Sequence, residues 1–250
     1  MSVRSVKHWA GTWVCASALV FLGGCATGPS ANPKDPLEPM NRSISHFNDV
    51  LDDSVLRPAA TGYRNGVPQP IQTGVRNFFN NLSDVWSTVN NGLQLEGRNT
   101  AESCMRVVVN TVFGIYGVFD VATAIGLQRH PRDFGETLAV WGVPNGPYLV
   151  LPVFGPSTLR DTAGMPVDMS MDLVRDINSI PERNSAWALR LVDKRADLLQ
   201  TTTLLEEASL DKYSFIREAY LQHRRWEIYD GNPPDEDNGD DAAPAESAPQ

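Results

Sequence analysis

The sequence has few of the residues on which disulfide scaffolds, metal centres and nucleic-acid surfaces depend. Its 250 residues include three cysteines and four histidines. Three cysteines exclude a disulfide-stabilised scaffold, and four scattered histidines leave little for a metal site. A formal net charge of −9 argues against nucleic-acid binding, because no excess of basic residues can neutralise a phosphate backbone. The chain is nevertheless long enough to bury a core.

Motifs of common enzymes and nucleotide-binding proteins are absent from the sequence: CxxC, HExxH, GxSxG, the P-loop and GxGxxG. Cys104 lies on a predicted helix and is better explained as a small buried thiol than as a nucleophile. Glu136 and Asp161 lie near glycine-rich segments, where a paired acid–base role is one interpretation. Ion pairs with Arg132 or Arg160 are the favoured one. We therefore predict a protein that is not an enzyme and uses no metal or cofactor.

A signal for export and lipidation occupies the start of the chain. Trp9–Leu22 contains 14 residues without a charge and follows two basic residues. This run is shorter than the roughly 20 residues of a membrane span and suits the core of a signal peptide. Small residues then precede Cys25, so that Leu22-Gly23-Gly24-Cys25 resembles a bacterial lipobox. We predict a signal peptide at residues 1–24 and acyl chains on Cys25; an ordinary secretory signal is the alternative.

The remaining chain divides into a tether, a body and a tail. Residues 25–36 are small, polar and proline-rich and predict an acylated tether. Residues 230–250 carry seven acidic residues and no basic one, which predicts a disordered acidic tail that aids solubility or docks a partner. The body at 37–229 is predicted as a single helical domain. Without the two basic residues of the signal the net charge is −11, of which the body carries about −4.

Apolar residues recur at helical spacing through most of the body. Pro58 is expected to end or bend a short helix that starts near Ser54, and Thr100 is expected to cap a helix that runs to Phe113. A break is expected near Ser83. The predicted helical segments are 37–51, 54–58, 68–82, 85–93, 100–113, 182–200 and 203–226.

The middle of the chain, Phe134–Asp161, combines apolar side chains with glycine and proline. Gly142, Pro144 and Gly146 cannot sustain regular structure, and Pro152 excludes a central strand. We therefore expect an irregular apolar hairpin. This hairpin either fills the core or contacts membrane lipid, since lipid tolerates exposed apolar side chains that water does not favour.

Several motifs in order carry a family resemblance. Together with the Phe134–Asp161 segment and the lipobox, they resemble the VacJ/MlaA family of outer-membrane lipoproteins, densely over residues 35–166 and more loosely to about 229. The motifs are Asp35–Arg42, Arg57-Pro58, Val67–Pro70, Val75–Phe78, Asn80–Leu82, Asn110–Gly114 and Phe119–Ala122.

The resemblance implies an all-α single domain, in which a ring of amphipathic helices surrounds a central amphipathic channel. It implies a lipid-anchored protein on the periplasmic side of the outer membrane of a Gram-negative bacterium. Such a protein removes mislocalised phospholipids from the outer leaflet and passes them to a periplasmic lipid-carrier protein, which maintains lipid asymmetry. Phospholipid is then the cargo, and a trimeric porin is a partner.

Within this frame, the apolar hairpin is our candidate for a mobile wall of the lipid path. Trp141, Tyr148 and Leu151 would form the wall, and Gly142 and Gly146 would be its flexible points. Arg160 and Asp161 are candidates for the polar side of the channel. The alternative function is a structural envelope lipoprotein that braces porins without transporting lipid.

Overall fold

The computed structural model describes residues 35–234. The predicted signal peptide, the lipidation site Cys25, most of the tether and most of the acidic tail lie outside the described residues. Within 35–234, the helices are all too short or too polar to cross a membrane.

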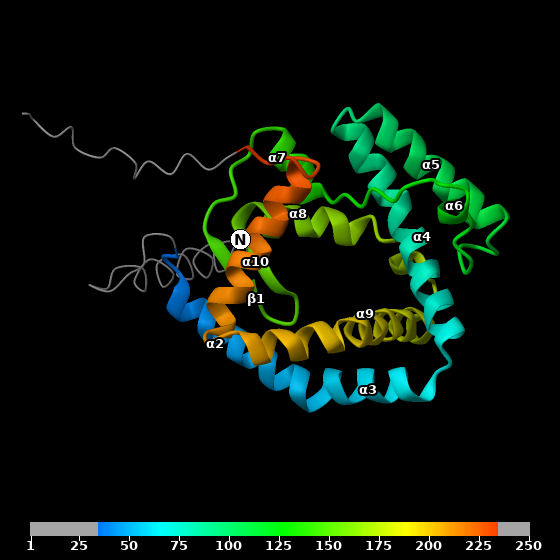
Figure 1. Cartoon of the computed structure of the whole chain (residues 1–250). Helices are drawn as coiled ribbons and strands as arrows, with labels where there is room; N and C mark the ends of the chain where they lie inside the picture. Colours follow the sequence, from blue (N-terminus) through cyan, green and yellow to red (C-terminus); the bar gives the residue numbers. More distant parts are fainter. Residues whose placement is uncertain (1–34, 235–250) are drawn as a thin grey trace, which may run out of the picture.

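The described chain is mostly helical and has only one small two-stranded sheet, which confirms the predicted all-α class. Its helices follow one another around a ring: α3 packs against α9 along one side, α4 lies beside α5, α7 lies beside α8, and α10 closes the circle next to α2 (Figure 1). The elements are α2 (Glu38–Leu51), the π-helix η1 (Asp52–Leu56), α3 (Arg57–Gly66), α4 (Gln69–Leu93), α5 (Gly97–Val112), α6 (Val121–Ala124), α7 (Phe134–Val140), β1 (Tyr148–Leu151), β2 (Gly155–Thr158), α8 (Leu159–Ser170), the 3-10 helix η2 (Leu173–Asp176), α9 (Ile180–Ala208) and α10 (Lys212–Ile228).

Two expected interruptions of the helices are absent from this structure. Pro58 lies in the first turn of α3, directly after η1, where a missing amide hydrogen costs little. α4 continues through Ser83, whose hydroxyl donates to the carbonyl of Phe79 at 3.0 Å. A serine that donates to its own helix remains compatible with that helix, so the expected break was wrong.

Two expected boundaries are also displaced. Thr100 lies inside α5 rather than capping it, and its hydroxyl donates to the Glu96 carbonyl at 2.8 Å. α9 runs on to Ala208, although a boundary was predicted at residues 201–202. Thr202 and Thr203 donate to carbonyls one turn earlier, at 2.8 and 3.0 Å, so these polar residues do not interrupt the helix.

The distribution of polar and apolar side chains is inverted relative to an ordinary soluble core. Among the described residues, nine hydrophobic side chains are buried and twenty-two polar or charged ones are buried. Large hydrophobic side chains are exposed instead, as in Val112 (66%), Phe113 (72%) and Tyr116 (73%). Exposed apolar surface on this scale marks contact with a membrane or a partner.

Candidate functional site

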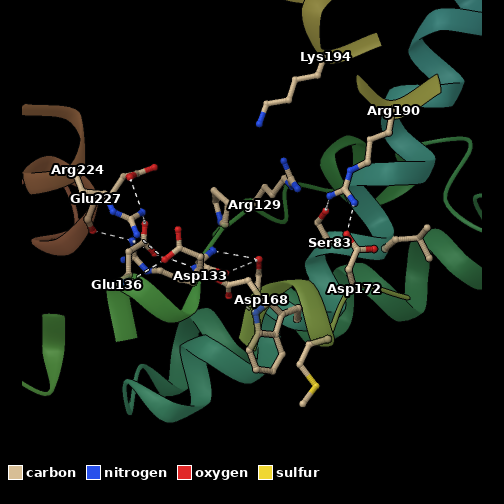
Figure 2. Close-up of a pocket in the computed structure, with 16 residues that line it drawn as sticks. Ser83, Arg129, Asp133, Glu136, Asp168, Asp172, Arg190, Lys194, Arg224 and Glu227 are labelled. Carbon is tan, nitrogen blue, oxygen red and sulfur yellow. Dashed lines mark hydrogen bonds and ion pairs between the residues drawn. The ribbon is translucent and has the colours of Figure 1, made fainter. Parts of the chain in front are cut away.

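A polar cavity of about 430 Å³ lies where α4, α7, α8, α9 and α10 approach one another (Figure 2). Charged side chains dominate its wall. The lining residues are Leu82, Ser83, Trp86, Ser87, Arg129, Pro131, Arg132, Asp133, Glu136, Asp168, Met171, Asp172, Arg190, Lys194, Arg224 and Glu227. Such a lining suits a charged, hydrated group and excludes an apolar ligand.

Arg224 of α10 organises one side of this cavity. Its guanidinium is buried and donates to Asp133 at 2.6 Å, to Glu136 at 2.9 Å and to Asp161 at 3.1 Å. The Tyr220 hydroxyl, one turn earlier on α10, donates to the same Asp161 carboxylate at 2.8 Å. A guanidinium offers five donors in a planar fork, so one arginine can join α10 to carboxylates on two other helices.

Helix caps position these carboxylates. Asp133 caps α7 by accepting from the Glu136 amide at 2.9 Å, and the Glu136 carboxylate accepts in return from the Asp133 amide at 3.3 Å. Thr158 caps α8 by accepting from the Asp161 amide at 3.1 Å. The first turns of two helices therefore present their acidic residues to Arg224, where the helix dipoles also favour negative charge.

The two buried carboxyl groups differ in their titration. Burial is the main cause that raises the pKa of Glu136 to about 8; the neighbouring Asp133 carboxylate adds to the rise, and Arg224 and Arg132 oppose it. Burial also acts to raise the pKa of Asp161, but Arg224 and the Tyr220 hydroxyl hold this pKa below its usual value. The cavity wall therefore has one carboxyl, Glu136, that takes up a proton near neutral pH, and Asp161 behind this wall stays ionised.

The sequence-predicted residues Arg160 and Asp161 come together but do not line the cavity. Both are buried, and Arg160 donates to Asp161 at 2.8 Å. Glu136 lies 3.7 Å from Arg132. Asp161 is therefore confirmed as a member of an ion pair, and Glu136 lies within ion-pair distance of Arg132 as predicted. The channel-lining role of Arg160 and Asp161 stays a prediction. Asp161 accepts a hydrogen bond from Arg224, which does line the cavity.

The apolar hairpin is a regular two-stranded antiparallel pair rather than an irregular loop. Tyr148 is buried against Val150 and Tyr213, and Leu151 pairs with Gly155. Pro152 lies in the turn between the strands, where it interrupts no ladder hydrogen bond. Strand β1 therefore forms part of the small core of this side of the ring.

Two asparagines of α2 pair with the free edge of β1. The Asn41 amide donates to the Tyr148 carbonyl at 3.0 Å and accepts from the Val150 amide at 2.9 Å. Asn48, two turns later, makes the same pair of bonds with the Leu151 carbonyl and the Val153 amide, at 2.9 and 2.8 Å. These side chains satisfy the strand edge as a third strand would.

The segment between α7 and β1 holds the other predicted wall residues. Trp141 is 55% exposed, packs edge-on against Phe134 and donates to the Leu93 carbonyl at 3.2 Å. Gly142 and Gly146 have φ of +89° and +65°. Both glycines are therefore required by the turn conformation, and an alanine at either position would be strained as well as stiffer.

Most residues of the cavity wall were not predicted from the sequence. Asp168, Lys194 and Arg224 come from three different helices, α8, α9 and α10, and no local pattern marks them. The Asp133 and Asp161 regions did carry a signal, because Asp133-x-x-Glu136 and Thr158-x-x-Asp161 fit the pattern of a helix start. Among the described residues, the acidic, cysteine and histidine side chains form no group suited to a metal ion. Cys104 is exposed on α5, so the prediction of a buried thiol was wrong.

A second cavity, of about 860 Å³, is apolar and lies on a different part of the ring. It is formed by the start of α4, the loop after α5 and the first half of α9. Its hydrophobic lining includes Pro70, Ile71, Val75, Phe78, Phe79, Val118, Phe119, Ala186 and Leu189. The molecule therefore offers separate surroundings for charged groups and for hydrocarbon.

Fold and cavities together define a class: a ring-shaped helical protein with an ion-paired polar cavity and apolar side chains on its surface. The profile of the MlaA lipoprotein family matches residues 33–227. The chain belongs to this family, which confirms the resemblance found in the sequence.

Relatives and a solved structure agree with this assignment. The intermembrane phospholipid transport system lipoprotein MlaA of Escherichia coli K12 is 38% identical over 213 residues, with 83% of this chain and 84% of that protein covered. MlaA of Haemophilus influenzae is 36% identical over 220 residues, with coverage of 85% and 88%. A solved structure, described as the structural basis for maintenance of bacterial outer membrane lipid asymmetry, superposes with a TM-score of 0.69 at 36% identity. It covers 78% of this chain and 98% of the other.

Proposed function

We propose that this chain is an outer-membrane lipoprotein that forms a channel for phospholipids. It removes mislocalised phospholipids from the outer leaflet and maintains lipid asymmetry. One observation carries the proposal: a polar, ion-paired cavity lies within a ring that exposes many large apolar side chains. A phospholipid needs both surroundings, because its headgroup is charged and its tails are hydrocarbon. The names of the relatives, which specify intermembrane phospholipid transport, support the same function.

The exposed apolar side chains support a position within one leaflet. Helices that are too short or too polar to span a bilayer can lie in its interface with their apolar faces in the acyl region. In this proposal, acyl chains on Cys25 anchor the chain on the periplasmic side, a trimeric porin holds it, and a periplasmic carrier protein receives the lipid. No catalytic step is part of the proposal.

Lipid content and transfer test the function directly. The full-length acylated protein is purified in mild detergent, its bound phospholipid is measured by native mass spectrometry, and it is then mixed with a lipid-free periplasmic carrier. We expect phospholipid to copurify and to appear on the carrier. A purified protein without phospholipid, together with a normal outer leaflet in cells that lack the protein, would support the porin-bracing alternative instead.

Cys25→Ala tests the anchor separately. We expect this variant to leave the outer-membrane fraction and to cause surface-exposed phospholipid and detergent sensitivity. An unchanged membrane fraction would show that acylation of Cys25 does not anchor the protein.

A further inference from the structure

Two side chains at the polar cavity carry charge that the protein does not neutralise. Lys194 of α9 and Asp168 of α8 both line the cavity. Within residues 35–234, Lys194 forms no ion pair, and Asp168 forms none either. Figure 2 shows the Lys194 amine extending into the open space that Asp133 and Asp168 face from the other side. Charges left unpaired beside a cavity are the ones available to a ligand.

Asp168 keeps half of its carboxylate available. One oxygen, Oδ1, accepts from the Trp86 indole at 2.7 Å and from the Phe134 amide at 2.8 Å. The described hydrogen bonds leave Oδ2 without a donor. Burial raises the pKa of Asp168, as expected for a carboxylate with no cation in contact. The side chain is thus held rigidly at one oxygen while the other can accept from a ligand.

The opposite side of the cavity provides a place for an anion. Arg129 is fixed by its Nε–Asp84 bond at 2.6 Å and by a weaker contact of Nη2 with the Asn80 carbonyl. Its Nη1 has no partner among the described residues, and Figure 2 shows the guanidinium extending into the same space as Lys194. A guanidinium and an ammonium that share one space are a suitable pair for a phosphate group.

We infer that the cavity selects a headgroup that carries both a phosphate and a primary ammonium, as in phosphatidylethanolamine, over an anionic headgroup. Lys194 and Arg129 contact the phosphate, and Asp168 accepts from the ammonium. The inference rests on the proposed function and adds the class of lipid. An anionic headgroup such as glycerol phosphate can use the basic side, but it has no cation to offer Asp168.

Competition between lipids tests the selection. The full-length acylated protein is incubated in detergent with equal amounts of phosphatidylethanolamine and phosphatidylglycerol that have identical acyl chains. After the bound lipid has exchanged, the lipids on the protein are quantified by mass spectrometry. We expect roughly tenfold enrichment of phosphatidylethanolamine, which is near the lower end of what one charge-assisted hydrogen bond contributes. Asp168→Asn should bring the ratio close to one, because the amide keeps the acceptor for Trp86 and Phe134 and loses the charge. The exposed Asp176→Asn is the matched control and should keep the wild-type ratio.

Lys194→Gln tests phosphate binding separately from ammonium binding. Both lipids carry a phosphate, so this variant should lower total binding several-fold while keeping the enrichment. A third lipid, phosphatidylcholine, has a quaternary ammonium that cannot donate, and it should bind less well than phosphatidylethanolamine.

Three outcomes are distinguishable. Equal binding of the two lipids by the wild type, or an unchanged ratio in Asp168→Asn, would overturn the selection and leave the proposed transport function intact. Displacement of bound lipid by millimolar inorganic phosphate alone would show a simple anion site and would also overturn it. Absence of any bound phospholipid would contradict both the selection and the proposed function.

Discussion

At the residue scale, the central feature is one arginine that serves several carboxylates. Arg224 contacts Asp133, Glu136 and Asp161, which come from the first turns of α7 and α8. Removal of one partner from a buried ion pair costs about 3–5 kcal/mol, because it leaves a charge without compensation. The wall of the polar cavity therefore depends on a residue that no local sequence motif identifies.

The raised pKa of Glu136 predicts a pH dependence of stability. A carboxyl whose folded pKa lies near 8 binds a proton in the folded state that the unfolded chain, with a pKa near 4.5, has lost. The contribution of this group to the free energy of unfolding is therefore complete below pH 4.5 and declines as the pH rises toward 8. In Glu136→Gln this decline should disappear, which reduces the proton uptake linked to folding by about one proton near pH 6.

Chemical denaturation at several pH values between 5 and 8 measures this effect. Asp176→Asn, which removes an exposed carboxylate, is the control and should leave the pH dependence unchanged. If Glu136→Gln showed the wild-type pH dependence, Glu136 would be ionised throughout this range in the folded protein.

At the scale of elements, glycines allow α7, α8 and α10 to approach one another. A Cβ atom on Gly135 would lie 2.6 Å from Asp161 Oδ1 and 2.7 Å from Arg224 Nη2. On the other side, a Cβ on Gly164 of α8 would lie 3.0 Å from the Gly135 amide nitrogen. The ion pairs of the cavity wall therefore require the absence of side chains at these two positions.

Gly135→Ala is predicted to destabilise the protein by about 2–3 kcal/mol, because the added methyl group must displace a buried ion pair. Gly62→Ala in α3 is the matched control. A Cβ there meets nothing within 4 Å, so this helix-interior substitution should stabilise by about 0.5–1 kcal/mol. Urea denaturation of both variants measures the difference. Equal effects in the two variants would contradict the close packing at Gly135.

The boundaries of the elements were partly predictable. Helical periodicity identified most of the long helices, because an apolar stripe is a local pattern. The hairpin was expected from its glycines and prolines, but its regular pairing was not. Asn41 and Asn48 satisfy the edge of β1 from a helix about a hundred residues earlier in the chain, and such a contact leaves no local pattern.

At the scale of the whole molecule, the inverted distribution of side chains supports the proposed contact with lipid. Phe113 is 72% exposed at the end of α5, near Val112 and Ile115, which are also exposed. Water does not favour such a group of side chains, whereas the acyl region of a leaflet does. The net charge of −9 says nothing about this surface, since it is a property of the chain and not of one face.

Phe113→Glu should weaken association with phospholipid vesicles by roughly tenfold, because an apolar side chain is exchanged for a charge in the acyl region. The measurement uses the Cys25→Ala background, in which no acyl anchor contributes, and vesicle flotation. Gln200→Glu adds the same charge at another exposed position on α9 and is the control. If the two variants bound vesicles equally well, this surface would not contact lipid.

The helical class, the polar and apolar faces of most helices and the membership of the family can be read from the sequence alone. These are local properties, because periodicity, helix caps and short motifs can be recognised without knowledge of the fold. The fold is needed to show that the interior is largely ionic while many large apolar side chains are exposed, and that Arg224, Lys194 and Asp168 line one cavity. The reason is physical: an amphipathic helix has the same sequence pattern whether its apolar face packs inward in water or faces outward into lipid.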